Sequence, residues 1–140
     1  MFESAAICLQ LADLNPGAGL IGPVGSTGRG IVYQWVVFAV SELEGPLFRW
    51  IRDLGEGVIA SAAHDRFTDA ALAVQSALAE RDWLVDDRFS VADVMCASVL
   101  QTANARELLR PWPRLEAYVQ RGEVRPAYTR AAAIWDRPRA

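Results

Sequence analysis

The ten residues from Ile31 to Val40, IVYQWVVFAV, are hydrophobic at every position except Gln34. A helix with this sequence is apolar on every side. Such a helix is either buried all round or packs one face on its own core and another face against something else. The stretch is too short to cross a bilayer, which needs about 20 residues. The remaining segments therefore have to fold around this helix.

The composition of the chain fits that requirement. Its 140 residues suit one domain, and 52% of them are hydrophobic while 22% are charged, the balance of an ordinary globular protein. The net charge of −3 gives no electrostatic footprint for nucleic acid and no basic helix face for an anionic membrane. The N-terminus shows no basic region followed by an apolar stretch, so we expect no signal peptide and a cytoplasmic location.

Hydrophobic residues recur at helical spacing along the chain, and no segment shows convincing strand alternation. The first helix carries a stripe of Ile7, Leu11 and Leu14 and stops at the Asn-Pro-Gly sequence of residues 15–17. A linker follows, because six of the ten glycines lie between residues 17 and 30. The pattern predicts an all-α fold, a compact bundle of about six helices.

The later helices have their own boundary signals. One helix is predicted from Thr27 to the Gly-Pro step at residues 45–46, where proline should kink it, with a continuation to Leu54 left open. A long helix covers residues 60–81, and another runs from Ser90 to about residue 105. Two short helices follow: Pro113 suits the first position of one, Gly122 interrupts it, and Arg125-Pro126 starts the second. The last residues, 136–140, are expected to fray.

The segment FSVADVM is the clearest local signal. Ser90 is a good N-cap, and Asp93 stands three residues later, where its carboxylate can accept a hydrogen bond from the amide of the cap. Phe89 and Val94 are placed to close a hydrophobic staple over the same turn. Such a cap contributes about 1 kcal/mol, and we interpret this capping box as structural rather than catalytic.

Few residues offer catalytic chemistry. His64 is the single histidine, and it has no cysteine or second histidine near it in the sequence, so no metal site and no catalytic base is expected there. Glu42 and Glu44 are two residues apart, which places them on different sides of a helix, and Asp53 and Glu56 follow further on. We expect no acid–base pair among these carboxylates.

The two cysteines, Cys8 and Cys96, lie in apolar surroundings without metal-ligand spacing. Buried free thiols in a reducing compartment are the expected state, and a disulfide between them is the unsupported alternative.

The first residues of the chain are a candidate ligand-binding site. A helix that begins at Glu3 and Ser4 presents free backbone amides and a partial positive charge, which suit a carboxylate ligand. A serine hydroxyl adds a hydrogen bond, and Glu3 can accept from a ligand ammonium. An α-amino acid group carries both charges. The alternative is an ordinary helix start in which Glu3 complements the helix dipole.

These segments, in this order, resemble the glutathione transferase family, and most of all its bacterial members. The resemblance rests on ESAAICLQLADLNP, a Gly/Pro-rich linker, RGIVYQWVVFAVSELEGPL, FSVADVM and WPRLEAYVQRGEVRPAY, and it covers nearly the whole chain. It implies the helical C-terminal domain of that family at residues 26–140, a linker at 15–25, and at 1–14 the last helix of a truncated thioredoxin-like domain.

The resemblance also implies roles for particular residues. Glu3 and Ser4 match the pair that binds the γ-glutamyl end of glutathione, which is a co-substrate rather than a cofactor. The helix with Tyr33, Val37 and Ser41 supplies part of the wall for a hydrophobic electrophile. Some bacterial relatives have a polar residue in place of Val37 and a histidine in place of Glu44, so this chain departs from them at both positions.

The family forms homodimers through the helix at residues 4–14 and the long helix after the linker, which would cover the apolar stretch 31–40. The strands and the thiol-activating residue of the thioredoxin-like domain have no counterpart in this sequence. We therefore assign no catalytic residue, and we expect the chain to be inactive by itself. The function implied is that of a glutathione transferase fragment. The alternatives are a non-catalytic helical interaction domain of the same superfamily and, more weakly, an unrelated small helical bundle.

Overall fold

The computed structural model describes residues 1–52 and 57–135, and the regular structure in these ranges is helical. The elements are α1 (Ser4–Leu14), η1 (Pro16–Ala18), α2 (Thr27–Phe38), η2 (Ala39–Glu44), α3 (Gly45–Arg52), α4 (Gly57–Leu78), α5 (Val91–Asn104), α6 (Pro113–Glu123) and α7 (Pro126–Trp135). The prediction of an all-α fold is confirmed.

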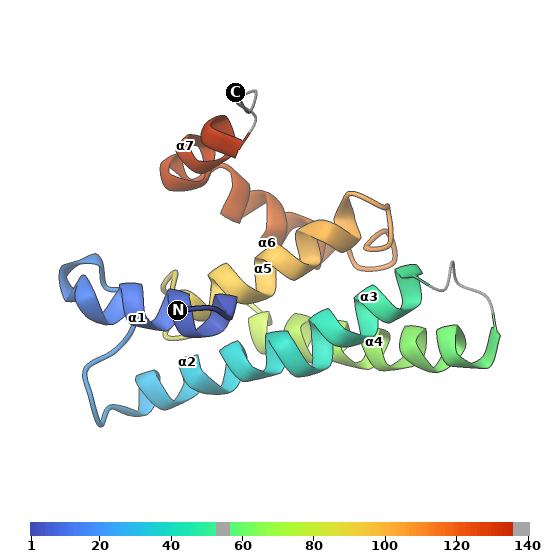
Figure 1. Cartoon of the computed structure of the whole chain (residues 1–140), viewed down its shortest axis with the longest axis horizontal. Coiled ribbons are helices and arrows are strands. Elements are labelled where there is room, and N and C mark those ends of the chain that lie inside the picture. Colours follow the sequence, from blue (N-terminus) through green and yellow to red (C-terminus); the bar gives the residue numbers. More distant parts are fainter. Residues whose placement is uncertain (53–56, 136–140) are drawn as a thin grey trace.

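Helix α5 lies at the centre of the bundle and contacts α1, α2, η2 and α6. Figure 1 shows α2, η2 and α3 following one another as a single long rod, with α4 beside it, and the contacts of α4 with α3 and η2 agree with this view. Helix α1 lies to one side of the bundle, and α7 lies at the end of the molecule that carries the C-terminus.

For the apolar stretch 31–40 the sequence allowed either burial on all sides or burial of one face only, and the structure shows the second arrangement. Val32 and Val36 are buried in the core, whereas Tyr33 and Val37 are 40% and 64% exposed. The helix thus packs one face on its own bundle and leaves an apolar strip on the other face.

The rod formed by α2, η2 and α3 continues beyond Pro46, a continuation that the sequence had left open. The irregularity lies ahead of the proline, in η2, where the backbone widens into π-helical turns. Proline offers no N–H to the carbonyl of residue 42, and its ring crowds that carbonyl in a regular helix. The π-helical turns fall on the residues where this conflict arises, and α3 resumes at Gly45. The predicted continuation at Leu54 lies outside the described residues.

Three helix boundaries differ from the sequence prediction. Helix α4 begins at Gly57 rather than at residue 60. Helix α4 ends at Leu78 rather than residue 81, because Ala79 adopts a left-handed conformation with φ of 39°. Gly122 does not interrupt the chain but lies in the last turn of α6. The break falls at residues 124–125 instead, where Pro126 begins α7.

No helix in the described part of the chain is long and apolar enough to span a membrane. The predicted fraying of the tail concerns residues 136–140, which lie outside the described ranges.

Candidate functional site

The first turn of α1 presents an uncapped helix N-terminus. Glu3 is the N-cap residue, and its carbonyl accepts the hydrogen bond from the amide of Ile7 at 3.0 Å, but no side chain caps the turn. Glu3 and Ser4 are both exposed. Glu3 has φ of 69° and ψ of 115°, a conformation that L-residues rarely adopt and that costs on the order of 1–3 kcal/mol.

The other end of α1 is fixed to the bundle by Arg29, which sequence reasoning missed. Its Nη2 donates to both carboxylate oxygens of Asp13 at 2.8 Å, and its Nη1 donates to the carbonyl of Gly22 at 3.1 Å. The guanidinium is only 11% exposed. The hydrogen bonds to Asp13 and Tyr33 raise the pKa of Arg29 further above its ordinary value. This residue therefore joins α1, the linker and α2.

The predicted wall residues share one face of the rod. Tyr33 and Val37 lie on α2 and Ser41 lies on η2, at intervals of four residues, and all three side chains are exposed. The phenol oxygen of Tyr33 accepts a hydrogen bond from Nε of Arg29 at 2.6 Å, which orients the ring. The spacing of Arg29 and Tyr33 at i and i+4 on α2 is the sequence signal that could have revealed this pair.

The two groups of predicted site residues lie on separate elements, one on α1 and the other on the rod. Within residues 1–52 and 57–135, no hydrogen bond or ion pair joins Glu3 or Ser4 to Tyr33, Val37 or Ser41. The structure connects them only indirectly, through Arg29, which holds α1 by Asp13 and orients Tyr33 on α2.

The capping box at the start of α5 is the centre of a buried network. Asp93 Oδ2 accepts from the amide of Ser90 at 2.8 Å and from its hydroxyl at 3.0 Å. The other oxygen, Oδ1, accepts from the amide of Leu84 at 3.0 Å and from the phenol of Tyr118 at 2.9 Å. Burial raises the pKa of the Asp93 carboxyl, although these hydrogen bonds oppose the rise. The network fastens the loop before α5, α5 itself and α6.

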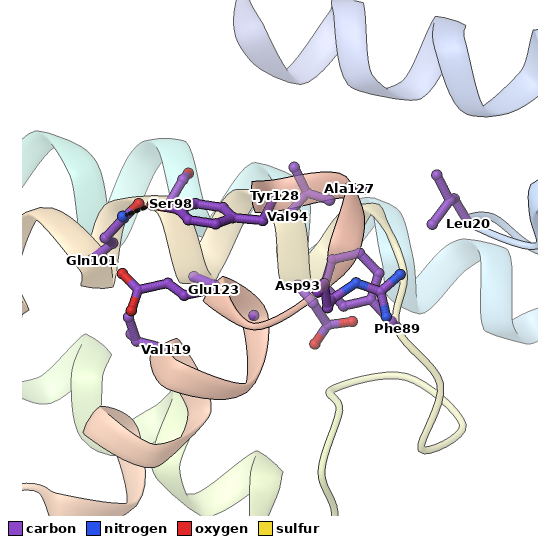
Figure 2. Close-up of a pocket in the computed structure, with 13 residues that line it drawn as sticks. Leu20, Phe89, Asp93, Val94, Ser98, Gln101, Val119, Glu123, Ala127 and Tyr128 are labelled. Carbon is purple, nitrogen blue, oxygen red and sulfur yellow. Dashed lines mark hydrogen bonds between the residues drawn. The ribbon is translucent and has the colours of Figure 1, made fainter. Parts of the chain in front are cut away.

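A groove opens between α5, the end of α6 and α7 (Figure 2). Its volume is about 350 Å³, and most of the side chains around it are apolar. At one end Gln101 Nε2 donates to the hydroxyl of Tyr128, and toward the other end Arg125 lies 3.6 Å from the centroid of the Phe89 ring. No sequence motif had pointed to this groove.

His64 and Glu42, at which we expected no catalytic or metal site, make ordinary side-chain contacts. His64 lies edge-on to Trp50, with ring centroids 4.6 Å apart, and it is 3.3 Å from the carboxylate of Asp65. Glu42 forms an ion pair with Arg66 at 3.1 Å. Asp53 and Glu56 lie outside the described residues. Across the ranges that the structure describes, no three His, Cys, Asp or Glu side chains gather as a metal site would require.

Comparison with known proteins decides the family. The model of the glutathione S-transferase C-terminal domain matches residues 46–121, which is more than half of the chain. The chain belongs to the glutathione S-transferase family. This family uses glutathione as a substrate, and the bundle described above has the helical fold of its C-terminal domain.

Individual relatives agree with this assignment. The chain is 31% identical over 128 residues to glutathione S-transferase GstA of Escherichia coli O157:H7. It superimposes with a TM-score of 0.85 and 29% identity on the crystal structure of a glutathione transferase from Methylococcus capsulatus. It superimposes with a TM-score of 0.82 and 28% identity on a sphingomonad glutathione S-transferase complexed with glutathione.

These relatives are longer than this chain. The match covers 89% of this chain but 62% of GstA. It covers 94% of this chain but 66% of the Methylococcus and sphingomonad structures. About a third of each relative therefore has no counterpart in the 140 residues.

Proposed function

We propose that this chain forms the helical half of a glutathione transferase that conjugates glutathione to a hydrophobic electrophile. In this reaction the sulfur of the glutathione thiolate attacks the electrophilic carbon, and the leaving group departs with the electron pair. The chain contributes binding and shape. Activation of the thiol falls to a thioredoxin-like domain of the kind that the family places before this one.

The proposal rests on one observation, the strained backbone of Glu3 at the uncapped N-terminus of α1. Glu3 holds a costly backbone conformation that no local hydrogen bond of its side chain explains, and strain of this kind is concentrated at ligand-binding sites. The uncapped amides of the first turn suit the α-carboxylate of the γ-glutamyl group, and the Glu3 carboxylate suits its ammonium. Ser4 is small enough for the ligand to approach and adds a hydroxyl.

The exposed strip of the rod supports the electrophile side of the proposal. Tyr33 and Val37 offer apolar surface, and Ser41 adds a hydroxyl in addition to the phenol of Tyr33, a combination that suits a largely apolar substrate. The proposal includes a homodimer and a cytoplasmic location, and the free thiols of Cys8 and Cys96 support a reducing compartment.

The test joins the thioredoxin-like domain of GstA in front of this chain and measures conjugation of 1-chloro-2,4-dinitrobenzene. Replacing Glu3 by Gln removes a charge-assisted hydrogen bond, so the KM for glutathione should rise about tenfold while the KM for the electrophile stays constant. Val37→Ser should raise the KM for the electrophile and leave the KM for glutathione unchanged. Glu80→Gln is the control, because Glu80 is 96% exposed on the side chain and lies beyond α4.

An unchanged glutathione KM in both Glu3→Gln and Ser4→Ala would reject the assignment of the tip. The 140-residue chain alone should pass through immobilised glutathione without retention, since most of the site is supplied by the other domain. Retention of the chain alone would contradict the claim that its share of the site is incomplete.

A second candidate is a non-catalytic interaction domain, which the open groove between α5 and α7 favours. The same fusion separates the two candidates, because a helical interaction domain gives no conjugation with any thioredoxin-like domain placed before it.

A further inference from the structure

Glu44, the last residue of η2, carries a half-buried carboxylate that has no partner. In the described part of the chain, no hydrogen bond or ion pair involves its side chain. Its neighbour Glu42 differs, because it forms an ion pair with Arg66 of α4 at 3.1 Å. A carboxylate that gives up part of its hydration without gaining a partner costs free energy, which a bound cation would recover. Glu44 therefore leaves a place for a positive charge that the described side chains do not fill.

Phe48 of α3 offers a second group that attracts cations. It follows Glu44 by four residues, the spacing that places two side chains on the same face of a helix. Its ring is 49% exposed, although burial of a phenyl group would be favourable. The face of an aromatic ring attracts positive charge, and aromatic side chains commonly bind quaternary ammonium groups. The carboxylate and the ring thus suit the same class of ligand.

The rod is open to a ligand next to these two residues. Gly45 is exposed, and a Cβ placed there would meet only the carbonyl of Val40 within 4 Å, at 3.9 Å, apart from its own turn of the helix. Ser41, one turn earlier, is small and exposed as well. A ligand can therefore approach the backbone of the rod between Val37 and Phe48.

These residues continue the strip that supports the electrophile side of the proposed function. Gly45 follows Ser41 by the same interval of four residues that separates Val37 from Ser41. We propose that Glu44 and Phe48 make this site selective for hydrophobic electrophiles that carry a quaternary ammonium or similar cationic group. This rests on the proposed function. The bond changes are the same, since a sulfur–carbon bond forms and the leaving group departs with the electron pair of its bond to that carbon.

The test uses the fusion with the thioredoxin-like domain of GstA and two electrophiles of matched shape. Both are amides of 4-chloro-3-nitrobenzoic acid, from which glutathione displaces chloride. One carries a 2-(trimethylammonio)ethyl group on the amide nitrogen, and the other carries the neutral 3,3-dimethylbutyl group. Relative to the uncatalysed reactions, we expect kcat/KM of the parent fusion to be about tenfold higher for the cationic amide.

Glu44→Gln keeps the shape of the side chain without its charge, so it should remove this preference while the KM for glutathione stays constant. Phe48→Leu keeps an apolar side chain without the ring, so it should reduce the preference about threefold. Glu42→Gln is the matched control. It also removes one negative charge from η2, but from a carboxylate that already contacts Arg66, so the preference should remain.

Binding of the two amides without their chlorine to the 140-residue chain, followed by NMR titration, repeats the comparison without any reaction. Glu44 and Phe48 both belong to this chain, so the cationic amide should bind more tightly here too, and Glu44→Gln should cancel the difference. Equal losses in Glu42→Gln and Glu44→Gln would overturn the inference, because general negative charge would then attract the cation.

The inference and the proposed function can fail separately. If the fusion does not conjugate but the chain still prefers the cationic amide through Glu44, the cation site stands and the proposed function is rejected. If the fusion conjugates both amides without preference, the proposed function stands and the cation site is rejected.

Discussion

Asp93 joins several segments of the interior by hydrogen bonds. Its carboxylate is fully buried and accepts hydrogen bonds from Leu84, Ser90 and Tyr118, which come from three different segments. Removing the acceptor leaves several buried donors unpaired, and each of these costs about 1–3 kcal/mol. The capping box thus does more than begin α5, because the second carboxylate oxygen fixes α6 to the preceding loop.

We predict that Asp93→Ala lowers the free energy of unfolding by about 3 kcal/mol, since it removes the cap and strands the phenol of Tyr118. Urea denaturation followed by tryptophan fluorescence measures the change. Asp69→Ala, at an exposed position on α4, is the control and should stay within about 0.5 kcal/mol of the parent chain. A loss below about 1 kcal/mol for Asp93→Ala would mean that the network is not a major source of stability.

The same carboxyl makes stability depend on pH. Because burial raises the pKa of Asp93 in the folded chain, the unfolded state loses this proton first as the pH rises. The contribution of Asp93 is then greatest below its unfolded pKa, near 4, and declines as the pH rises through the folded pKa. The difference in unfolding free energy between the parent chain and Asp93→Asn should therefore become less favourable to the parent as the pH rises above about 4. If the difference instead becomes more favourable to the parent chain as the pH rises, the hydrogen bonds lower the pKa of Asp93 by more than burial raises it.

The two thiols differ in exposure. Cys96 is fully buried in the core and Cys8 is half-buried on α1, and burial raises the pKa of both thiols. We predict that iodoacetamide modifies only Cys8 in the native chain, with a rate that still increases above about pH 10, where the same thiol in urea has levelled off. Peptide mapping by mass spectrometry identifies the site. Modification of Cys96 without denaturant would show that α5 opens readily.

Helix α1 packs on the core through Ala5, Cys8, Leu9 and Ala12, and a charged contact also holds it. Ala12 is its one fully buried residue among those described, and the stripe of Ile7, Leu11 and Leu14 that identified the helix in the sequence faces solvent. Arg29 adds a polar attachment between α1 and α2, because its guanidinium binds both carboxylate oxygens of Asp13. The orientation of the Glu3 and Ser4 tip follows from that contact.

We predict that Arg29→Gln releases α1 from the bundle while α5 stays folded. Hydrogen–deuterium exchange should show faster exchange of the α1 amides and unchanged protection in α5. Arg66→Gln is the control, since Arg66 forms an exposed ion pair on α4 and should leave α1 unaffected. Unchanged exchange in α1 would show that apolar packing alone holds this helix.

The whole molecule keeps a large share of apolar surface in contact with water. Leu11 and Leu14 on α1 are 55% and 66% exposed, and Val37 on the rod is 64% exposed. The groove between α5 and α7 is a separate apolar surface. Exposed apolar surfaces of this extent are typical of interfaces, and the proposed homodimer would cover the first of these two surfaces.

We predict that the purified chain is a dimer, and that Leu11→Asp together with Leu14→Asp converts it to a monomer without lowering the helix content. Size-exclusion chromatography with light scattering measures the mass. Leu72→Asp, at a 41% exposed position on α4, is the control and should leave the dimer intact. A compact monomer for the parent chain would reject the α1 and α2 surface as a dimer interface.

Local signals in the sequence were enough to predict which segments are helical and how several of them begin and end. Helical periodicity, prolines at first helical positions and the Ser90–Asp93 box act over a few residues, so they can be read without knowing the neighbours. The order of the motifs also predicted the family that the comparison then established. The boundary misjudged at Gly122 was also local, because glycine is tolerated within a helix and Pro126 decided where the next one begins.

The side that each helix turns to the core depends on contacts between distant segments. Periodicity marked Ile7, Leu11 and Leu14 as one face of α1, yet the fold turns that face outward, because the face with Ala5, Cys8, Leu9 and Ala12 packs on the core. The pairing of residues 13 and 29, the phenol of Tyr118 on Asp93 and the groove under α7 all join segments distant in sequence. Contacts of this kind are set by the packing of whole helices, and no local pattern records them.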